Sequence, residues 1–442
     1  MLPPTTGGNM RILVWPGTTE IGREVARSLR DDRTIEVLGA GTKSHEGDLV
    51  FRETYLLPNV KTGSFVWLDA LQRLIEVAKI DFVYPAHDDV GFALAGTEFV
   101  QAGRVIGSPV KTVITCRSKA RTYEALKGKV RVPGYGVYPN YAGFNLPAFV
   151  KPDAGQGSQG TAVVDDWKTL MTAVNRAREV SPEVLVCEYL PGTEFTIDCF
   201  STRGRGLQWF QVRSRDQTRA GISVHTSRVK DPGIVIPMGS WATSIDLALP
   251  MWGAWFFQVK LDGAGNPVLL EVAPRIPGGA PLARANGVNL PLLSVYEAMR
   301  LQIRVSDNDV VQTLERPLMN QYRATVTYDT LYMDLDDTLI HRGKVNPRMI
   351  ALLYQVKNSR KAVILLTRSK TIPFTLGEHR ISADLFDKII GLGMKESKAT
   401  YVTEKSAVFI DDSFSERIAV RDARKIPVFD ASGAECLVDD RA

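Results

Sequence analysis

The chain has 442 residues, more than one ordinary hydrophobic core holds, so two to four packed units are expected. Hydrophobic residues make up 44% and charged residues 23%, a balance typical of folded globular proteins, and no run of roughly 18 apolar residues predicts a membrane span. The net charge of +5 is small and dispersed, which argues against a nucleic-acid surface, and four cysteines without a C-x-x-C pair indicate a reducing, cytoplasmic setting.

Short apolar runs alternate with helical patterns over residues 10–115, which predicts a parallel, doubly wound sheet. The turn after the first strand departs from the dinucleotide fingerprint G-x-G-x-x-G. Thr19 replaces the glycine that lets a pyrophosphate approach the backbone, so a tight turn without a cofactor is expected. The predicted elements, after a flexible leader over residues 1–9, are a strand over 11–14, a turn over 17–22, a helix over 20–29 and a strand that ends at 82–85.

The predicted pattern of strands, turns and helices changes twice after residue 115. Residues 116–305 contain strands joined by glycine-rich turns, as in an antiparallel sheet. Residues 306–328 are mixed polar and include Pro317, which predicts a linker, and residues 329–442 return to strand–helix alternation. The expected fold class is therefore a multidomain chain of α/β and α+β units.

A glycine-rich hairpin is the first candidate for phosphate chemistry. Residues 155–160 match G-x-G-x-x-G, but they lie between predicted strands over 148–151 and 161–164 rather than before a helix. Unobstructed backbone N–H groups in such a loop can fold over phosphates, and the ammonium of Lys151 on the incoming strand can meet them. Alone, the pattern is equally typical of a plain turn.

The segment EYLPGTE, residues 188–194, follows an apolar strand. A carboxylate and nearby backbone groups at such a strand end can read the edge of an adenine, and a second carboxylate can bind ribose hydroxyls. The alternative interpretation is an acidic surface turn.

A predicted hairpin ahead of Arg275 carries a pair of side chains suited to a metal. If Asp262 pairs with Pro267 across the turn, the same register places Gln258 opposite Glu271 with both side chains on one face. A purely structural hairpin would carry apolar residues at paired inward positions, whereas carboxylate and amide oxygens suit magnesium. Arg275 can then neutralise a transferring phosphate.

In this order the motifs resemble the ATP-grasp superfamily, and within it the carbamoyl-phosphate-synthase-like branch, over roughly residues 10–305. The resemblance implies a Rossmann-like pre-ATP-grasp lobe over 10–115, with PGTTEIG and PAHDDV, and an ATP-grasp domain over 116–305. It implies ATP and Mg²⁺ as cofactors and these roles: phosphate binding by Lys119, Lys151, Gly157 and Ser158, adenine binding by Glu188 and the Leu190 backbone, ribose binding by Glu194, magnesium binding by Gln258 and Glu271, and transition-state stabilisation by Arg275.

Two features near these motifs need separate interpretation. The family commonly has E-x-N-P-R, and Ala273 stands at the asparagine position, so either a water replaces one metal oxygen or the metal site is weaker. A basic cluster holds Arg213, Arg215 and Arg219, a pattern that alone is typical of an exposed strand. In the family setting this region lies near phosphate and carboxylate substrates, so Arg213 and Arg219 are the expected substrate ligands.

Acidic residues follow predicted strands in the last part of the chain. Asp334 and Asp336 lie at the carboxyl end of an apolar strand, with their side chains on the same side. One carboxylate can attack phosphorus and the other can protonate the leaving oxygen. A later strand ends in Thr367, which can hold the phosphoryl group. Another ends at Asp411 and Asp412, whose carboxylates suit a magnesium site. In an open parallel sheet these strand ends meet at one edge.

This region resembles the haloacid dehalogenase (HAD) superfamily over residues 329–442, with a complete D-x-D-x-T motif at 334–338. The resemblance implies a capless parallel α/β phosphohydrolase with these roles: nucleophile Asp334, general acid/base Asp336, phosphate ligand Thr367, and Mg²⁺ ligands Asp334, Asp336, Asp411 and Asp412. Lys395, Lys398 and Lys405 all precede the last of these strands, and we assign Lys398 as the motif lysine because K-x-x-x-[VI] leads into that strand. A capless site relies on the bulk of its substrate or on another domain to close it.

Taken together, the motifs predict an amide-forming ligase fused to a phosphatase that acts on a related substrate, product or intermediate. The expected partners are ATP, a small carboxylate and amine, and a phosphorylated small molecule, with no nucleic acid and no membrane; a homo-oligomer is compatible with the sequence. One alternative is carbamoyl-phosphate-synthase-like phosphorylation of bicarbonate or carbamate, against which a single ATP-grasp unit speaks. Another is a nucleotide-binding regulatory protein, supported only by Ala273.

Overall fold

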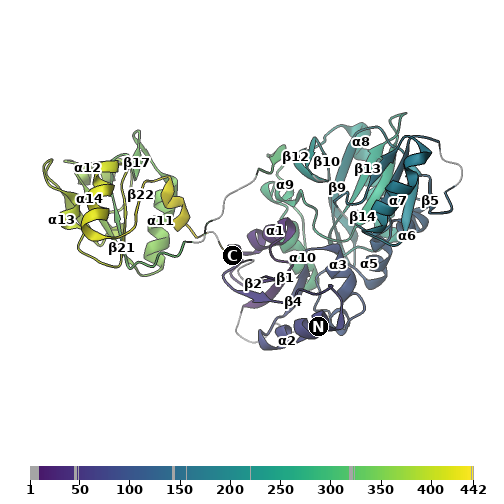
Figure 1. The fold of residues 1–442 in the computed structure, drawn as a ribbon, viewed down its shortest axis with the longest axis horizontal. Helices are drawn as coiled ribbons and strands as arrows, with labels where there is room; N and C mark the ends of the chain where they lie inside the picture. Colours follow the sequence, from purple (N-terminus) through teal and green to yellow (C-terminus); the bar gives the residue numbers. More distant parts are fainter. Residues whose placement is uncertain are drawn as a thin grey trace. The chain divides into compact units, whose positions relative to one another are not determined.

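The computed structural model describes residues 9–43, 47, 49–141, 145–155, 157–219, 221–317, 322, 324–439 and 441. The chain divides into two compact units, residues 1–318 with 441–442 and residues 319–440. Each unit is built of strands backed by helices, a mixed α/β organisation (Figure 1). The expected leader lies outside the described residues except for Asn9. Among the described helices, none combines the length and apolar character that crossing a membrane requires.

The N-terminal part of the first unit is a four-stranded sheet in the order β3-β2-β1-β4. All its paired strands are parallel, as the alternating sequence pattern predicts. Its strands are β1 (Met10–Trp15), β2 (Ile35–Gly41), β3 (Thr54–Leu56) and β4 (Phe82–Pro85). Its helices are α1 (Glu20–Leu29), α2 (Phe65–Val77), α3 (Asp88–Leu94), α4 (Glu98–Gln101) and α5 (Val110–Arg117).

The tight turn between β1 and α1 has a local structural explanation. The Thr19 hydroxyl accepts a hydrogen bond from the Gly22 backbone N at 3.1 Å and so caps α1. A Cβ atom at Gly22 would lie 2.3 Å from the Pro16 carbonyl oxygen, so the close approach of helix and strand requires glycine there. Helix capping and close packing therefore account for the sequence of this turn.

Two further sheets, largely antiparallel, form the rest of the first unit's framework. The first has the order β5-β8-β6-β7, and the second has the order β10-β9-β13-β14. Their strands are β5 (Tyr135–Val137), β6 (Ala148–Pro152), β7 (Ala162–Val164), β8 (Val184–Glu188), β9 (Glu194–Thr202), β10 (Gly206–Ser214), β13 (Gly253–Leu261) and β14 (Pro267–Ala273). The helices here are α6 (Lys119–Leu126), α7 (Leu170–Arg178), α8 (Pro232–Ala248), α9 (Ala280–Ala285) and α10 (Leu290–Ala298). Buried apolar clusters join α7 to the first sheet and α6 and α8 to the second.

A β-bulge interrupts the hairpin of β13 and β14. Gln258 pairs with Glu271, as the sequence predicts, but Pro267 pairs one residue earlier than predicted, with Leu261. Leu270 is the extra residue in β14 that absorbs this difference. The pairing of the two candidate metal ligands is thus confirmed, although the register assumed at the turn is wrong by one residue.

The segment over residues 307–317 packs on the first unit, where the sequence predicts a linker over 306–328. A small sheet in the order β11-β12-β15 consists of β11 (Gln217–Arg219), β12 (Ile222–Ser227) and β15 (Thr313–Glu315). The Asp307 carboxylate accepts hydrogen bonds from Arg228 Nη2 at 2.6 Å and from Trp209 Nε1 at 3.0 Å. The polar residues of this segment are therefore used in contacts with the first unit, and the connection to the second unit is shorter than expected.

The second unit is a five-stranded parallel sheet in the order β20-β19-β16-β21-β22. Its strands are β16 (Thr330–Met333), β19 (Ala362–Thr367), β20 (Lys388–Gly391), β21 (Ala407–Ile410) and β22 (Val428–Phe429), and a hairpin of β17 (Ile340–His341) and β18 (Lys344–Val345) follows β16. Its helices are α11 (Pro347–Asn358), α12 (Ile372–Glu378), α13 (Lys398–Tyr401) and α14 (Phe414–Arg424). Because β16 lies between β19 and β21, the residues that follow these three strands meet at one edge of the sheet.

Candidate functional site

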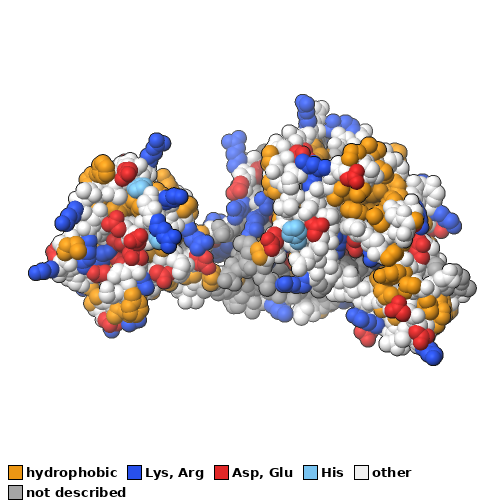
Figure 2. All heavy atoms as spheres, turned by 90° about the horizontal axis from the view of Figure 1, so that it is seen from above, with side chains coloured by type: hydrophobic (Ala, Val, Ile, Leu, Met, Phe, Trp, Pro, Cys, Tyr) orange, Lys and Arg blue, Asp and Glu red, His pale blue; other side chains and the backbone are white. Residues whose placement is uncertain are grey.

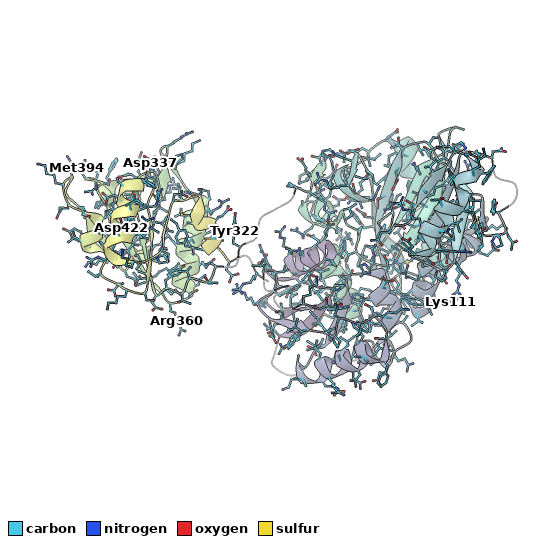
Figure 3. All side chains as sticks on the ribbon, viewed as in Figure 1. Lys111, Tyr322, Asp337, Arg360, Met394 and Asp422 are labelled. Carbon is cyan, nitrogen blue, oxygen red and sulfur yellow. The ribbon has the colours of Figure 1, made fainter. Side chains whose placement is uncertain are left out.

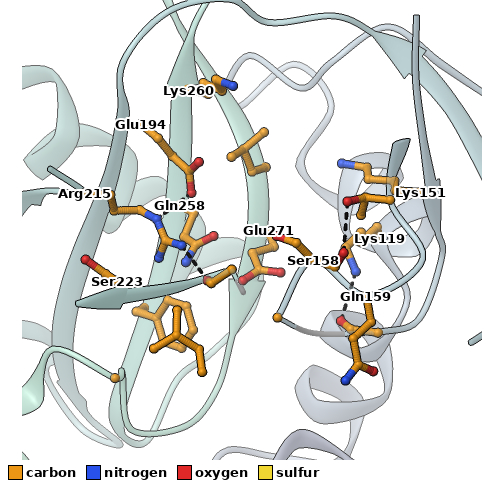
Figure 4. Close-up of a pocket in the computed structure, with 18 of the residues that line it drawn as sticks. Lys119, Lys151, Ser158, Gln159, Glu194, Arg215, Ser223, Gln258, Lys260 and Glu271 are labelled. Atoms are coloured by element: carbon orange, nitrogen blue, oxygen red, sulfur yellow. Dashed lines mark hydrogen bonds and ion pairs between the residues drawn. The ribbon is translucent and has the colours of Figure 1, made fainter. Parts of the chain in front are cut away.

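A cavity of about 560 Å³ lies in the first unit. Its walls come from both largely antiparallel sheets, the glycine-rich loop, the small sheet that contains β12, and the start of α1. Figure 4 shows Glu271 near its centre, with Gln258 and Arg215 on one side and Lys119 and Lys151 on the other. This volume is in the range of small-molecule sites. The cavity therefore gathers most of the residues that the sequence assigns to the nucleotide and the metal.

Two lysines of the cavity contact neutral hydrogen-bond partners. Lys151 is buried on β6, and its Nζ donates to the Tyr123 hydroxyl at 2.6 Å. That hydroxyl donates in turn to the carbonyl of the bulge residue Leu270 at 2.6 Å. Lys119 Nζ donates to the Gly155 carbonyl at 3.2 Å, and burial lowers the pKa of Lys119 although Glu271 opposes the shift. Neither contact is an ion pair, so both ammonium groups can still pair with an anion.

The glycine-rich loop reaches the cavity through Gly157 and Ser158, both with positive φ values of 60° and 55°. A Cβ atom at Gly221 would lie 2.5 Å from the Gly157 carbonyl carbon and 2.8 Å from the Ser158 hydroxyl oxygen. Glycine at position 221 thus allows the strand-joining turn of the small sheet to approach the loop closely. The contact holds the loop beside the two lysines.

The residues assigned to adenine and ribose line the wall at the end of β8 and the start of β9. Glu188 Oε1 accepts a hydrogen bond from the Gly134 backbone N at 3.0 Å, and Leu190 is buried. Glu194 forms an ion pair with Arg215 Nε at 2.7 Å. A nucleoside in this position would meet one carboxylate that is already engaged by an arginine.

Gln258 and Glu271 are linked to Arg215. In the amide orientation that satisfies both ends, the Gln258 nitrogen donates to Glu271 Oε1 at 3.2 Å and its oxygen accepts from Arg215 Nη1 at 3.1 Å. Paired amide and carboxylate oxygens on neighbouring strands fit a magnesium ion that also binds phosphate, once the amide turns its oxygen toward Glu271. Ala273, two residues along the same strand, supplies no oxygen from its side chain.

Arg275 is held by the N-terminal part of the unit. Its Nε donates to Asp88 Oδ2 at 2.7 Å, and its guanidinium lies 5.1 Å from the centre of the Phe256 ring. Burial would raise the pKa of Asp88, but Arg275, with smaller contributions from His87 and Arg117, holds that pKa below its usual value. This ion pair fixes the arginine at the cavity, where its charge can stabilise a transferring phosphoryl group.

The structure separates the two arginines expected as substrate ligands. Arg213 is buried, lines the cavity and donates from Nε to both oxygens of Asp198 at 3.1 and 2.9 Å. Arg219 lies on the exposed strand β11 and is not part of the cavity wall. Arg215, which the sequence analysis set aside, lines the cavity instead. The alternation of side chains along β10 stops before Arg215, so the pattern alone could not rank the three arginines.

The second unit brings a lysine and three aspartates together at the carboxyl edge of its sheet. Lys398 Nζ donates to Asp334 Oδ1 and to Asp411 Oδ2, both at 2.6 Å. Carboxylate oxygens of Asp334, Asp411 and Asp412 lie within 4.8 Å of one another, which fits a divalent cation. Figure 2 shows acidic side chains gathered on the smaller unit beside Lys and Arg side chains.

The remaining assigned residues of this unit lie around that cluster. Thr367 is fully buried at the end of β19, and its hydroxyl accepts from the Ser369 backbone N at 3.0 Å. Asp336 is exposed after β16, as is its neighbour Asp337, which Figure 3 labels. Burial raises the pKa of Asp334 to about 7, although Lys398 opposes the shift. Burial also raises the pKa of Asp411. Burial thus makes it costly for these carboxylates to carry negative charge.

Sequence reasoning assigned no role to four residues that lie at or beside the cavity. Tyr123 carries the contact of Lys151, Arg215 contacts Gln258, His87 follows β4, and Arg316 follows β15. His87 lies inside PAHDDV and Arg215 lies inside the basic cluster, so these two gave a signal in the sequence. Tyr123 and Arg316 act from elements that no motif marks.

Comparisons with known proteins add to this geometry. Residues 180–321 match a family model described as ATP-grasp in the biosynthetic pathway with Ter operon. A stretch of 57 residues is 39% identical to a D-alanine–D-alanine ligase of Phocaeicola vulgatus and covers 13% of this chain. It spans only 18% of the length of that curated relative.

Solved structures resemble a larger part of the chain. The biotin carboxylase domain of the 2-oxoglutarate carboxylase from Hydrogenobacter thermophilus, solved with MgADP and bicarbonate, matches with a TM-score of 0.57 and 18% identity, over 69% of this chain and 72% of that chain. An L-amino acid ligase from Bacillus licheniformis matches with a TM-score of 0.54 and 19% identity, over 67% of this chain and 75% of that chain. At these identities the likeness shows the fold: the chain is a mixed α/β multidomain protein with an ATP-grasp-like fold.

Proposed function

We propose that the first unit, with its ATP-grasp-like fold, is an ATP- and magnesium-dependent carboxylate–amine ligase, and that the second unit is a phosphohydrolase. The observation that carries the ligase is the meeting of Lys119, Lys151, Gln258, Glu271 and Arg275 at one cavity. The named relatives include ligases and carboxylases, which supports ATP-driven activation of a carboxylate or bicarbonate.

In the proposed reaction a substrate carboxylate oxygen attacks the γ-phosphorus of ATP, the bond to the bridging oxygen breaks, and ADP leaves. Lys119 and Lys151 hold phosphate oxygens, and Arg275 stabilises the charge that develops on the transferring group. The amine nitrogen then attacks the acyl carbon, phosphate leaves with the acyl oxygen, and the nitrogen loses a proton. When bound between Gln258 and Glu271, magnesium supplies charge neutralisation of the phosphates.

ADP release measured against a panel of carboxylates and amines tests this function. We expect release to require one member of each class and to yield an amide that mass spectrometry detects. Bicarbonate is a separate arm of the panel: ADP release with bicarbonate and no amine would favour carbamoyl-phosphate-synthase-like phosphorylation. Tight ATP binding without turnover on any pair would support a nucleotide-binding regulatory protein instead.

A specific observation favours the second activity. Asp334, Lys398 and Asp411 lie in direct contact at a strand edge, with Asp412 close enough to share a cation. In the proposed reaction an Asp334 oxygen attacks phosphorus, Asp336 protonates the leaving oxygen, and water then cleaves the aspartyl phosphate. Thr367 holds the phosphoryl group during both steps. Magnesium at the aspartates would supply charge neutralisation for the incoming phosphate.

Hydrolysis of p-nitrophenyl phosphate in the presence of Mg²⁺ tests this second activity. We expect turnover by the full chain. When the reaction is quenched with acid, we also expect a burst of phosphorylated protein, because an acyl phosphate on Asp334 survives brief acid treatment. The absence of hydrolysis with this and a panel of phosphorylated metabolites would remove the phosphatase from the proposal without touching the ligase.

A further inference from the structure

The cavity of the first unit extends beyond the residues used for ATP. Its wall also includes Thr19 and Glu20 at the start of α1, Ser223 of β12, and Gly278 and Gly279. The proposed reaction assigns no role to these residues. Two arginines of the wall, Arg213 and Arg316, lie beside these glycines.

Arg213 has a donor that no group of the described chain satisfies. Its side chain is only 3% exposed, and its Nε is taken by Asp198. Its Nη1 is buried and has no hydrogen-bond partner. Buried guanidinium donors are nearly always paired, so an unpaired one that lines a cavity points to a ligand.

Arg316 approaches the same place from the segment after β15. Its Nη1 donates to the Ser223 carbonyl at 3.1 Å, and its Nη2 donates to Glu20 Oε2 at 2.5 Å. Its side chain is 18% exposed, whereas that of Glu20 is 52% exposed. The arginine is therefore held at the cavity wall, while its carboxylate partner stays largely in solvent and competes weakly for it.

Two adjacent glycines bring these arginines together. A Cβ atom at Gly279 would lie 2.4 Å from Arg213 Nε and 2.9 Å from its Nη1, and one at Gly278 would lie 3.4 Å from Arg316 Nη1. Any side chain at position 279 would collide with the Arg213 guanidinium. The Gly278–Gly279 pair therefore has one guanidinium against each residue, an arrangement suited to one anionic group.

We propose that Arg213 and Arg316 form an anion subsite on either side of Gly278–Gly279, for a carboxylate or phosphate group of the substrate that does not react with ATP. The inference rests on the proposed function, since it treats the part of the cavity around Lys119, Lys151 and Glu271 as the nucleotide site. It restricts the ligase to substrates with a second anionic group. Carboxylate–amine pairs without a second anionic group are poor substrates, because they leave the buried Nη1 donor of Arg213 unpaired.

Site-resolved arginine modification tests the subsite on the full chain, because the second unit also attracts phosphate. The protein is saturated with Mg²⁺ and a non-hydrolysable ATP analogue, treated with an arginine-specific dicarbonyl reagent, and digested for peptide mass spectrometry. Inorganic phosphate and malonate are added in separate arms. We expect one or both anions to slow modification of Arg316 by at least about threefold. Arg219, exposed on β11 of the same small sheet, is the internal control and should react at an unchanged rate.

A variant separates a two-arginine subsite from protection by Arg316 alone. Arg213→Lys keeps a positive charge beside Asp198 but lacks the second donor, so the anion concentration for half protection of Arg316 should rise about fivefold. Protection by phosphate alone identifies a phosphate group, and protection by malonate alone identifies a carboxylate. Equal modification of Arg316 with and without anions, or unchanged protection in Arg213→Lys, would overturn the subsite. Failure of the ATP analogue to bind, measured first by calorimetry, would instead count against the proposed function.

Discussion

The lysines of the two candidate sites differ in their partners, which are neutral groups in the first site and carboxylates in the second. In the first unit Lys151 and Lys119 contact a hydroxyl and a carbonyl, and the cavity wall carries seven Lys and Arg side chains against four Glu. In the second unit Lys398 lies between Asp334 and Asp411. The charge of the first site therefore favours a polyanion, whereas the carboxylates of the second site favour a cation.

The largest expected effect comes from removing the nucleophile of the second site. Asp334→Asn keeps the shape and a hydrogen-bond acceptor for Lys398 but not the anion, so hydrolysis of p-nitrophenyl phosphate should fall by at least about 10³-fold. Binding of an ATP analogue to the first unit, followed by calorimetry, should not change. Asp337→Asn, three residues later at an exposed position, is the matched control and should retain full turnover. Residual hydrolysis near the wild-type rate would assign the nucleophile elsewhere.

Removal of magnesium should separate the two sites next. With EDTA, phosphatase turnover should fall at least about 100-fold, because the uncompensated aspartates repel phosphate. The dissociation constant of an ATP analogue should rise only about tenfold, about 1.4 kcal/mol, because the lysines of the first site remain free to bind it. Turnover assays and calorimetry on one preparation measure both, and readdition of Mg²⁺ is the control. An equal loss at both sites would contradict the charge comparison.

Lys151→Ala should weaken nucleotide binding by about 2–4 kcal/mol, because it removes a buried ammonium that pairs with phosphate. Tyr123→Phe removes only the neutral acceptor of that ammonium, so its effect should be smaller, about 1 kcal/mol. Calorimetry with the ATP analogue measures both, and thermal melting controls for folding. Equal ATP affinity in wild type and Lys151→Ala would remove this lysine from the nucleotide site.

Ala273→Asn should have the smallest effect. Positions 271 and 273 share one face of β14, so an asparagine would add an oxygen beside Glu271. Magnesium affinity of the first site should tighten by at most about tenfold, measured by titrating Mg²⁺ in the ADP-release assay. Loss of all magnesium-dependent activity in a variant that still melts like the wild type would mean that Gln258 and Glu271 do not hold the metal.

Sequence patterns predict well where chemistry follows the end of a strand. The ends of β16, β19 and β21 lie side by side because parallel strands share an edge, and Lys398 contacts Asp334 there. Patterns predict less well where a contact depends on an irregularity. Leu270 shifts the register of β14 by one residue, and nothing in a two-residue alternation announces it.

Residues that act across long sequence separations were missed for a similar reason. Tyr123 reaches Lys151 from α6, and Arg316 reaches Glu20 from the segment after β15. Neither lies in a motif, and their roles arise only when distant elements pack together. The basic cluster of β10 and β11 shows the converse. Its three spaced arginines look alike in sequence, but Arg213 and Arg215 line the cavity, Arg213 while paired with a buried aspartate, and Arg219 lies on an exposed strand.

The packing of residues 307–317 decides where the gene can be divided to express the two halves separately. A fragment that stops at residue 305 loses β15, leaves β12 as an open sheet edge and takes Arg316 out of the cavity. Open edges invite pairing with other chains, so this shorter fragment is expected to self-associate. A fragment that stops at residue 317 keeps the Asp307 contacts with Arg228 and Trp209 and the complete cavity wall. A cut between the halves is therefore better placed after residue 317, inside the predicted linker, than at its start after residue 305.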